Sequence, residues 1–237
     1  MWHWNRYPGL TCDVPSQLYQ FSFAPKPDWT GVFAPGDEIQ RYLRDVVERF
    51  GLDDRIRLRS EVVSAVFDGA AWQVATADGM EIEADFVIAA TGVLHHPFTP
   101  DIPGLESFQG DIVHTARWDH GIETSGRRIA VIGNGSTGVQ IVSALQRDAT
   151  HIAHFVRTPQ WVIWAPISLP QPGVVGTILR RLPAVHRRFY GVLLRGSRIL
   201  TDIALRPTWQ RRLAQSYARW CLRVQIRDRE PVSYTHL

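Results

Sequence analysis

Cysteine and lysine are scarce in this sequence of 237 residues, and long apolar runs are missing. The two cysteines, Cys12 and Cys221, stand near opposite ends, which excludes a disulfide scaffold, a CxxC redox pair and a cysteine-rich zinc site. No apolar run approaches the ~20 residues that cross a bilayer. The first residues lack a basic stretch followed by an apolar one, so we expect no signal peptide and a cytoplasmic protein.

Lysine occurs once, as Lys26, and arginine supplies the other positive charges. The 26 basic and 23 acidic residues are nearly equal in number, but they are unevenly distributed along the chain. Between Val174 and Glu230, 13 arginines accompany three acidic residues. A basic stretch can bind nucleic acid or a membrane surface, yet a solvated face of helices is the commoner explanation, and we expect neither a nucleic-acid partner nor a membrane span.

The composition is otherwise that of a globular protein, with 45% apolar and 21% charged residues, and the length predicts one or two domains. Residues 1–35 are rich in aromatic residues, Pro and Gly, which indicates irregular loop. From Ile39 to Phe50 apolar residues recur at helical spacing, with start signals at Gly36-Asp37 and a stop at Gly51.

The apolar period then changes to two, which predicts short strands at residues 56–58, 61–67, 72–75 and 80–82. Asp68-Gly69 and Asp78-Gly79 are hairpin turn signals between them. Residues 86–90 form a continuous apolar run, typical of a strand buried on both faces, and end in Thr91-Gly92.

A second buried strand is predicted at 128–132, a helix at 136–145 and a strand at 151–156, which together have the size of one βαβ unit. From residue 177 to 229 the pattern predicts two or three basic helices, broken at Pro183 and Pro207.

The sequence Gly133-Asn134-Gly135-Ser136-Thr137-Gly138 fits GxGxxG at the junction of the predicted strand and helix. The first glycine permits a tight turn, the second lets the backbone approach a pyrophosphate, and the third lets helix and strand pack closely. The helix N-terminus then holds the anion. The alternative is a glycine-rich turn without a ligand.

Arg157-Thr158 follows the next predicted strand, where an NAD-binding unit has Asp or Glu for the ribose 2′-OH. A guanidinium suits a 2′-phosphate instead, so NADP is favoured over NAD. An ordinary surface arginine is the alternative.

Three segments together resemble the flavin-dependent Baeyer–Villiger monooxygenases. The first is residues 4–13, WNRYPGLTCD, with Tyr19 and the Phe21-Ser22-Phe23 run after it. The second is residues 108–119, which fit the family fingerprint FxGxxxHxxxW followed by Pro or Asp. The third is Ala90-Thr91-Gly92 at the end of an apolar run. The resemblance covers roughly residues 2–230.

The resemblance implies an α/β fold with two dinucleotide-binding domains, Rossmann-like parallel sheets, a small antiparallel β insertion and C-terminal helices. It implies FAD and NADP as cofactors and the insertion of one oxygen atom from O₂ into a ketone, giving an ester or lactone. Residues 1–120 would be part of the FAD domain, with the fingerprint as linker. Residues 121–173 would be the NADP-binding unit and 174–230 a basic helical segment.

The same resemblance implies roles for individual residues. The flavin ring would be lined by Trp2, Trp4, Asp13 and Tyr19, with Asp13 nearest the reacting centre. Thr11 and Cys12 would approach the nicotinamide together with Asp13. Val62 would touch the adenine of FAD, and Thr91 and Gly92 would pass near FAD.

For NADP, the resemblance implies that residues 133–140, including Gln140, cradle the pyrophosphate. Arg157 and Thr158 would bind the 2′-phosphate. His114 and Trp118, grouped with Asp13 as catalytic residues, would couple NADP binding to domain closure rather than carry out chemistry. Simpler roles remain open: core aromatics for Trp2 and Trp4, a turn residue for Asp13 and a core histidine for His114.

The sequence also departs from the family pattern. The family has a strand and a GxGxxG for FAD before residues 4–13, and an arginine that pairs with the Asp13 equivalent further on. Neither is found here, and residues 231–237 do not resemble the family, so we expect an internal piece of a longer enzyme with a non-native tail. A flavin N- or S-oxygenase and an inactive nucleotide-binding fragment are the alternatives. His95-His96 lacks further ligands at zinc-like spacing, so we expect no metal site.

Overall fold

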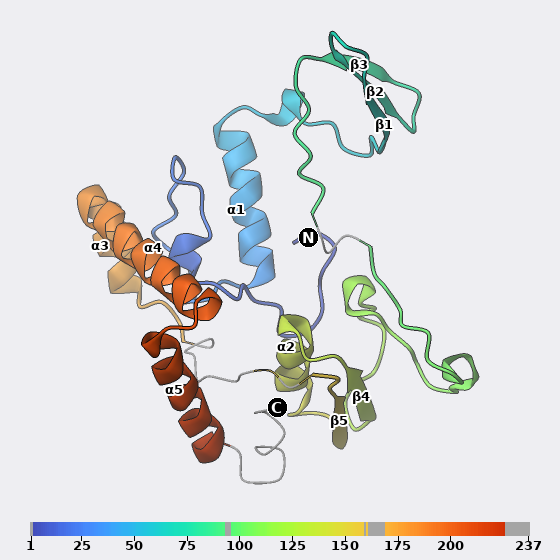
Figure 1. Cartoon of the computed structure of the whole chain (residues 1–237), viewed down its shortest axis with the longest axis vertical. Coiled ribbons are helices and arrows are strands. Elements are labelled where there is room, and N and C mark those ends of the chain that lie inside the picture. The colour runs from blue at the N-terminus through green and yellow to red at the C-terminus, as the bar shows by residue number, and fades with distance from the viewer. Residues whose placement is uncertain (1, 93–95, 159, 161–168, 226–237) are drawn as a thin grey trace. The chain divides into compact units, whose positions relative to one another are not determined.

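The computed structural model of the chain describes residues 2–92, 96–158, 160 and 169–225. The chain divides into two compact units, one formed by residues 41–98 and the other by residues 2–40 together with those from 99 onward. The helix α1 (Gly36–Arg49) begins in the second of these units and continues into the first. Figure 1 shows the helices and strands of both.

Helix α1 confirms the helix predicted from the apolar spacing of residues 39–50. Its apolar stripe is buried at Ile39, Tyr42 and Val46. Asp37 and Glu38 in its first turn and Arg49 in its last turn complement the helix dipole.

The unit of residues 41–98 holds a three-stranded antiparallel sheet in the order β1 (Val62–Phe67), β2 (Trp72–Thr76) and β3 (Glu81–Ala84). In the first hairpin Phe67 pairs with Trp72, and in the second Trp72 pairs with Ala84. Both predicted hairpins are therefore confirmed.

Each hairpin is closed by the Asp-Gly pair that predicted it. Gly69 and Gly79 adopt φ values of +104° and +85°, which favour glycine. Asp68 Oδ1 accepts hydrogen bonds from the backbone N–H groups of Ala70 and Ala71, at 2.9 and 3.0 Å. These bonds favour the charged carboxylate and lower the pKa of Asp68 to about 2.

Two strand predictions in this unit are wrong. Residues 56–58 and 86–90 form no strand, and the side chains of Phe86 and Ile88 are 85% and 89% exposed. A β-strand needs a neighbouring strand to complete its backbone hydrogen bonds. Within the described part of the chain no strand pairs with residues 86–90, so the apolar run stays unpaired.

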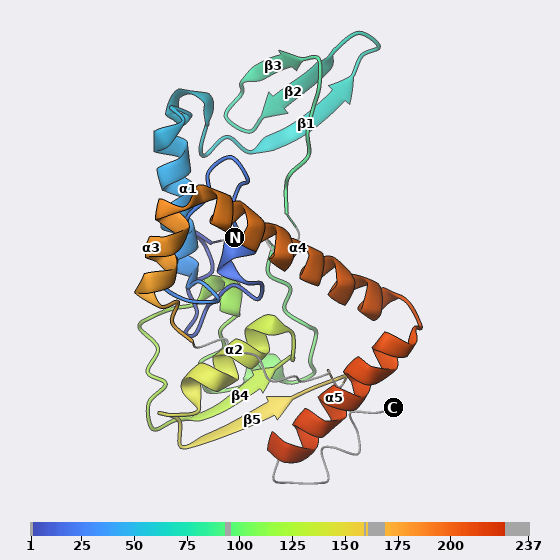
Figure 2. The same ribbon diagram turned by 90° about the vertical axis from the view of Figure 1, so that its left-hand side faces the viewer.

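The other unit is built around β4 (Arg128–Ile132), α2 (Ser136–Leu145) and β5 (His151–Phe155). The two strands are parallel, with Arg128 opposite His151 and Ile132 opposite Phe155. This confirms the predicted βαβ unit, and Figure 2 shows α2 packed beside the two strands. Its core cluster joins Val131, Ile141 and Leu145 to a residue from the N-terminal loop, Tyr7.

The prediction that 128–132 is buried on both faces is wrong. Val131 is buried toward α2, whereas the next residue, Ile132, is 60% exposed. The reason is that β4 and β5 form a two-stranded sheet and α2 covers one of its faces. Burial consequently alternates along β4 as it does in a half-buried strand.

Three helices follow: α3 (Gly173–Arg181), α4 (Pro183–Leu205) and α5 (Trp209–Gln225). The predicted breaks at Pro183 and Pro207 are confirmed, since Pro183 is the first residue of α4 and Pro207 lies between α4 and α5. Proline suits a helix start because its missing N–H would have no partner there. Of the helices that the structure describes, none is long and apolar enough to cross a membrane.

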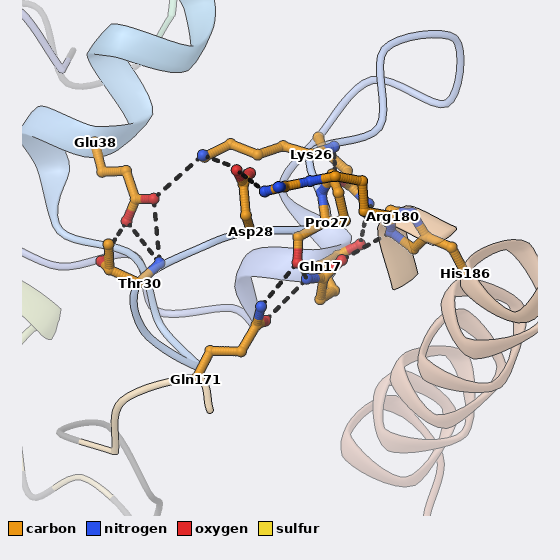
Figure 3. Close-up of polar contacts among 10 residues, drawn as sticks. Gln17, Lys26, Pro27, Asp28, Thr30, Glu38, Gln171, Arg180 and His186 are labelled. Atoms are coloured by element: carbon orange, nitrogen blue, oxygen red, sulfur yellow. Dashed lines mark hydrogen bonds and ion pairs between the residues drawn. The ribbon is translucent and has the colours of Figure 1, made fainter. Parts of the chain in front are cut away.

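A polar network fastens the N-terminal loop to α3 and α4 (Figure 3). Gln17 is buried; its Nε2 donates to Gln171 Oε1 at 2.9 Å, and its Oε1 lies 2.9 Å from Nε2 of His186 on α4. Asp28 bridges the only lysine, Lys26, at 3.0 Å and Arg180 of α3 at 2.7 Å. The loop thus has fixed anchors on both helices.

The carboxylate of Glu38 closes the other end of this network (Figure 3). It is buried and accepts the hydroxyl of Thr30 at 2.6 Å, together with the Thr30 backbone N–H at 3.2 Å. Lys26 Nζ lies 3.5 Å from it. A buried carboxylate needs such donors and a counter-charge, and the loop supplies both.

Candidate nucleotide-binding site

Three glycines shape the turn between β4 and α2, and each has a different physical reason. Gly133 adopts φ +106°, a conformation that side chains disfavour. A Cβ atom added at Gly138 would lie 2.0 Å from the carbonyl oxygen of Gly133, so helix and turn could not pack. A Cβ at Gly135 would meet nothing within 4 Å. The space beside Gly135 is therefore open to a ligand.

Helix α2 begins directly after this turn, with Gly135 as its N-cap and Ser136 as its first residue. The first-turn N–H groups of a helix have no partner within the helix, and the helix dipole makes this end positive. Open backbone at Gly133 and Gly135 together with this end makes a cradle for an anion.

The N-terminal loop packs directly on α2 through Gln140. Gln140 Nε2 donates to the carbonyl oxygen of Thr11 at 3.1 Å, and the Thr11 N–H donates to Gln140 Oε1 at 3.3 Å. The amide thus pairs with both backbone groups of one residue. Tyr7 adds its hydroxyl, 3.0 Å from Gln140 Oε1 and 3.3 Å from Thr137 Oγ1. Burial raises the pKa of Tyr7, so its hydroxyl stays protonated.

Gly9 makes this close packing possible. It adopts φ +81°, and a Cβ there would lie 2.9 Å from both Ala144 Cβ and the carbonyl oxygen of Gln140. The glycine of the NRYPG run therefore serves the contact with α2. Two residues after Gly9, the Thr11 hydroxyl oxygen is buried and has no hydrogen-bond partner among the described residues.

Asp13 reaches the start of α2. Its Oδ2 accepts the hydroxyl of Ser136 at 3.0 Å, and both residues are exposed. A carboxylate at a helix N-terminus is electrostatically favourable. The contact places Asp13 beside the glycine turn.

Cys12, the residue before Asp13, is buried, and its N–H donates to the carbonyl oxygen of Ala34 at 2.8 Å. Burial raises the pKa of its thiol. A thiol of this kind stays protonated and unreactive, so it offers packing rather than nucleophilic chemistry.

Arg157 and Thr158 follow β5 and are exposed. Asn134 of the glycine turn donates from Nδ2 to the carbonyl oxygen of Thr158 at 2.8 Å. This bond brings the end of β5 to the glycine turn. Arg157 and Thr158, which would distinguish NADP from NAD, therefore lie next to the anion cradle.

Trp2 and Tyr19 lie together near the start of the chain. The indole N–H of Trp2 donates to the Tyr19 hydroxyl at 2.9 Å, and the rings meet edge to face at 5.6 Å between centroids. Trp4 is 62% exposed and stands beside His3. An open pocket of about 460 Å³ is lined by Trp2, Tyr7, Thr11, Gln40 and other residues of the N-terminal loop and α1.

The fingerprint residues have local structural roles. His114 Nδ1 accepts the N–H of Ala116 at 3.1 Å and so caps the short helix Thr115–Arg117. Trp118 packs against the core cluster of Tyr7, Val131, Ile141 and Leu145. Trp118 thus ties residues 108–119 to the βαβ unit.

Three predicted site residues belong to the unit of residues 41–98. Val62 begins β1 and is 57% exposed. Thr91 is exposed, and Gly92 adopts φ +75°. The hydrogen bonds given above between other predicted site residues do not involve Val62, Thr91 or Gly92.

Two residues of the site were not predicted from the sequence. Tyr7 lies within the NRYPG run, but its side chain belongs to the core. His154 of β5 places Nε2 2.8 Å from the carbonyl oxygen of Gly133, and because a carbonyl accepts, this nitrogen carries the proton. The sequence could have pointed to His154, because side chains two positions apart on a strand lie on the same face. Ile152 packs against the core, so His154 lies on the face of β5 that meets α2.

Within residues 2–92, 96–158, 160 and 169–225, no group of three or more His, Cys, Asp or Glu side chains could hold a metal ion. His95, half of the His95-His96 pair, and residues 231–237 lie outside the described residues.

The model of one protein family, described as pyridine nucleotide-disulphide oxidoreductase, matches residues 19–191. An uncharacterized monooxygenase of Mycobacterium tuberculosis (strain ATCC 25618 / H37Rv) is 44% identical over 249 residues, which cover 94% of this chain and 49% of the relative. A Baeyer–Villiger monooxygenase of Streptomyces coelicolor is 41% identical over 194 residues, covering 81% of this chain and 37% of the relative.

Among solved structures, an oxidized steroid monooxygenase bound to NADP superposes with a TM-score of 0.70 and 39% identity, covering 79% of this chain and 37% of that one. The chain spans half or less of the length of these relatives. The resemblance to Baeyer–Villiger monooxygenases is confirmed. The predicted fold class is confirmed as well: an incomplete α/β fold of the flavoproteins with two dinucleotide-binding domains, of which the described residues hold one parallel βαβ unit, a small antiparallel sheet and helices.

Proposed function

Because this chain belongs to the pyridine nucleotide-disulphide oxidoreductase family, we propose that the protein is an FAD- and NADPH-dependent Baeyer–Villiger monooxygenase. It would insert one oxygen atom from O₂ into a ketone and form an ester or lactone. The observation that carries this proposal is the pairing of the Gln140 amide with both backbone groups of Thr11. It joins a segment that resembles Baeyer–Villiger enzymes to the helix of a nucleotide-binding motif.

The family description also includes disulphide chemistry, but the cysteines do not support it here. Cys12 and Cys221 are both buried and free, and no CxxC pair exists in the sequence. The relatives support oxygen insertion instead, because the similar protein of Streptomyces coelicolor is a Baeyer–Villiger monooxygenase.

The residues present fit the pyrophosphate of NADP. Open space at Gly133 and Gly135 and the start of α2 supply backbone donors without a blocking side chain. Asn134, Ser136, Thr137 and the tightly packed Gly138 would complete the cradle. Gln140 would act indirectly, by holding the N-terminal loop against α2, because its amide is already hydrogen-bonded to the backbone of Thr11.

Arg157 and Thr158 would bind the 2′-phosphate that distinguishes NADP from NAD. The exposed guanidinium of Arg157 is the group for a charge-assisted bond to a phosphate. The bond from Asn134 to the Thr158 carbonyl would hold this site against the pyrophosphate cradle.

Asp13 would act near the reacting centre, where the negative charge of its carboxylate would tune the electrostatics beside the nicotinamide. Its bond to Ser136 holds it at the start of α2, which supports this role. When bound, NADPH supplies the reducing electrons and FAD the chemistry with O₂. His114 and Trp118 would transmit NADP binding to the linker through the cap at Ala116 and the core contact.

The flavin ring would lie against Trp2, Trp4 and Tyr19, with Thr11 and Cys12 shaping the nicotinamide side. The hydrogen bond between Trp2 and Tyr19 fixes the orientation of the indole. Val62, Thr91 and Gly92 would contribute backbone contacts to FAD.

For the chain as a whole we propose residues 1–120 as part of the FAD domain, 121–173 as the NADP-binding unit and 174–230 as a helical segment. A ketone and O₂ would be the substrates, and the cytoplasm the location.

The test supplies the protein with FAD, NADPH, isotopically labelled O₂ and a panel of ketones, amines and sulfides. An ester or lactone that carries one labelled oxygen atom, formed only with NADPH, is the expected product. Labelled N-oxides or sulfoxides without any ester would instead establish an N- or S-oxygenase. NADPH binding, measured by nicotinamide fluorescence on the same protein, tests the nucleotide site separately from turnover.

A further inference from the structure

Both backbone groups of Gly133 are held by β5. The Gly133 N–H donates to the carbonyl oxygen of Phe155 at 2.9 Å, and the Gly133 carbonyl oxygen lies 2.8 Å from Nε2 of His154. The first bond continues the pairing of β4 with β5, in which Ile132 is opposite Phe155. The second bond comes from a side chain, so the residue type at position 154 decides whether it forms.

The carbonyl oxygen of Gly133 lies between the first turn of α2 and the imidazole of His154. A Cβ atom added at Gly138 would be 2.0 Å from this oxygen and 3.6 Å from His154 Nε2. The glycine at position 138 leaves room for the oxygen, and the imidazole supplies its hydrogen-bond donor. These groups all belong to the βαβ unit, so the contact does not depend on any segment outside it.

Fixing this carbonyl also fixes a backbone donor. In a planar trans peptide the carbonyl oxygen and the N–H point in opposite directions, so the N–H of Asn134 points away from His154 and Gly138. The side chain of Asn134 is bonded separately to the carbonyl oxygen of Thr158, at 2.8 Å. Of these bonds from β5, only that of His154 reaches the carbonyl of the peptide between Gly133 and Asn134.

Without this bond the same peptide could turn over. Glycine has wide conformational freedom, and asparagine adopts positive φ more readily than most residues. The peptide can therefore rotate as a unit through changes in ψ of Gly133 and φ of Asn134. The rotated peptide would present its carbonyl oxygen where the N–H now stands, and this acceptor would repel an anion.

We propose that His154 is a positioning residue of the nucleotide site. Its Nε2–H holds the peptide between Gly133 and Asn134 in the orientation that offers the N–H, rather than the carbonyl, to a dinucleotide pyrophosphate. This inference rests on the proposed NADP site, since it concerns the same glycine turn. The pyrophosphate is common to NADPH and NADH, so His154 contributes equally to both, whereas Arg157 would act on the 2′-phosphate alone.

The experiment measures the binding of NADPH and of NADH to the full chain by nicotinamide fluorescence. His154→Leu replaces the ring by an apolar side chain and removes the donor. We expect the dissociation constants for both nucleotides to rise by the same factor, roughly 2- to 10-fold, which is the range of one hydrogen bond. His151→Leu, at an exposed position on the same strand, is the matched control and should bind like the wild type.

Two amide variants separate the hydrogen bond from the packing of the ring. Glutamine places its Nε2 about as far from the backbone as histidine does, so His154→Gln can donate to the Gly133 carbonyl and should keep wild-type affinity. His154→Asn offers the same amide one bond nearer to the backbone, does not reach the oxygen and should bind like His154→Leu. Circular dichroism checks the fold of each variant, and the amide pair still decides the question if His154→Leu fails to fold.

Amide hydrogen exchange of the free protein provides a measurement without nucleotide. Loss of the His154 bond should speed the exchange of the Gly133 amide, which is bonded to the same strand, while amides within β4 keep their rates. His154→Gln should leave the Gly133 rate unchanged. Equal acceleration throughout the βαβ unit in His154→Leu would show a general loss of stability and would overturn the inference.

The binding outcomes distinguish this inference from the proposed function. Wild-type affinity of His154→Leu for both nucleotides would overturn the inference and leave the proposed NADP site in place. A loss that His154→Gln does not restore, equal binding by His154→Gln and His154→Asn, or a loss confined to NADPH would overturn it in the same way. A wild-type protein that binds neither nucleotide would instead overturn the proposed NADP site, and this inference with it.

Discussion

Ser136 and Asp13, which are far apart in the sequence, are joined by a hydrogen bond of 3.0 Å from the serine hydroxyl to the carboxylate. The first residue of α2 thereby meets the residue proposed to lie nearest the reacting centre. One turn further along α2, Gln140 holds Thr11 from the same loop. The two contacts differ in burial, and this difference predicts different consequences for stability.

Gln140→Ala should lower the free energy of unfolding by about 1–3 kcal/mol, because the backbone N–H and C=O of Thr11 would lose their partners in a partly buried place. Ser136→Ala is the matched control: its bond to Asp13 is exposed, and we expect a loss of about 1 kcal/mol or less. Urea unfolding of both variants measures the difference. A Gln140→Ala protein as stable as the wild type would show that the loop does not depend on this amide.

Substitution by alanine should have different effects at two glycines of the turn between β4 and α2: Gly138 should lose stability, and Gly135 should lose NADPH binding. Gly138→Ala places a Cβ atom 2.0 Å from the Gly133 carbonyl oxygen, so the fold must shift, and we expect a loss of about 1–3 kcal/mol or more in stability.

Gly135→Ala meets nothing within 4 Å and has extended backbone angles, so its stability should stay near that of the wild type. Its methyl group would instead occupy the space proposed for the pyrophosphate and weaken NADPH binding. Thermal unfolding and nicotinamide fluorescence measure the two effects. Unchanged NADPH affinity in a stable Gly135→Ala protein would contradict the proposed position of the cofactor.

Arg157→Ala should weaken NADPH binding far more than NADH binding. Loss of a charge-assisted bond to the 2′-phosphate, at ~1.5–3 kcal/mol, corresponds to a roughly 10- to 150-fold loss of affinity. Arg147→Ala, at an exposed position just after α2, controls for the change in net charge. Equal effects of Arg157→Ala on both cofactors would contradict the NADP assignment.

The sequence was informative where structure depends on neighbours along the chain. The glycine turn, the apolar period and the Asp-Gly pairs predicted β4, α2 and both hairpins, because strand–helix–strand units and tight turns are specified locally. Pro183 and Pro207 placed the helix breaks for the same reason.

The sequence was uninformative where a residue depends on a distant partner. Residues 86–90 have the composition of a buried strand, but pairing and cover must come from other segments, and Phe86 is exposed. The role of Tyr7 in the core of the βαβ unit depends on a contact 133 positions away, with Gln140. The spacing of apolar residues along the chain does not predict contacts between distant segments. The hydrogen bond between His186 and Gln17 could not be predicted for the same reason.

The buried His186 should make the stability of this unit depend on pH. Desolvation penalises the charged imidazolium and lowers the pKa of His186 below its ordinary value of 6.5. The unfolded chain therefore binds more protons than the folded one just below pH 6.5, so the free energy of unfolding rises with pH in this range. Conversely, stability is lost as the pH falls from 6.5 toward the folded-state pKa, where the loss levels off.

Gln can replace the neutral imidazole as a donor to Gln17 Oε1, so His186→Gln should fold while losing this part of the pH dependence. Urea unfolding across this pH range would show a smaller slope for His186→Gln than for the wild type. His120→Gln, which changes an exposed histidine of the same unit, should keep the wild-type slope. If His186→Gln also kept that slope, the acid sensitivity would have to come from other groups, and the anchor between α4 and the N-terminal loop would not be its source.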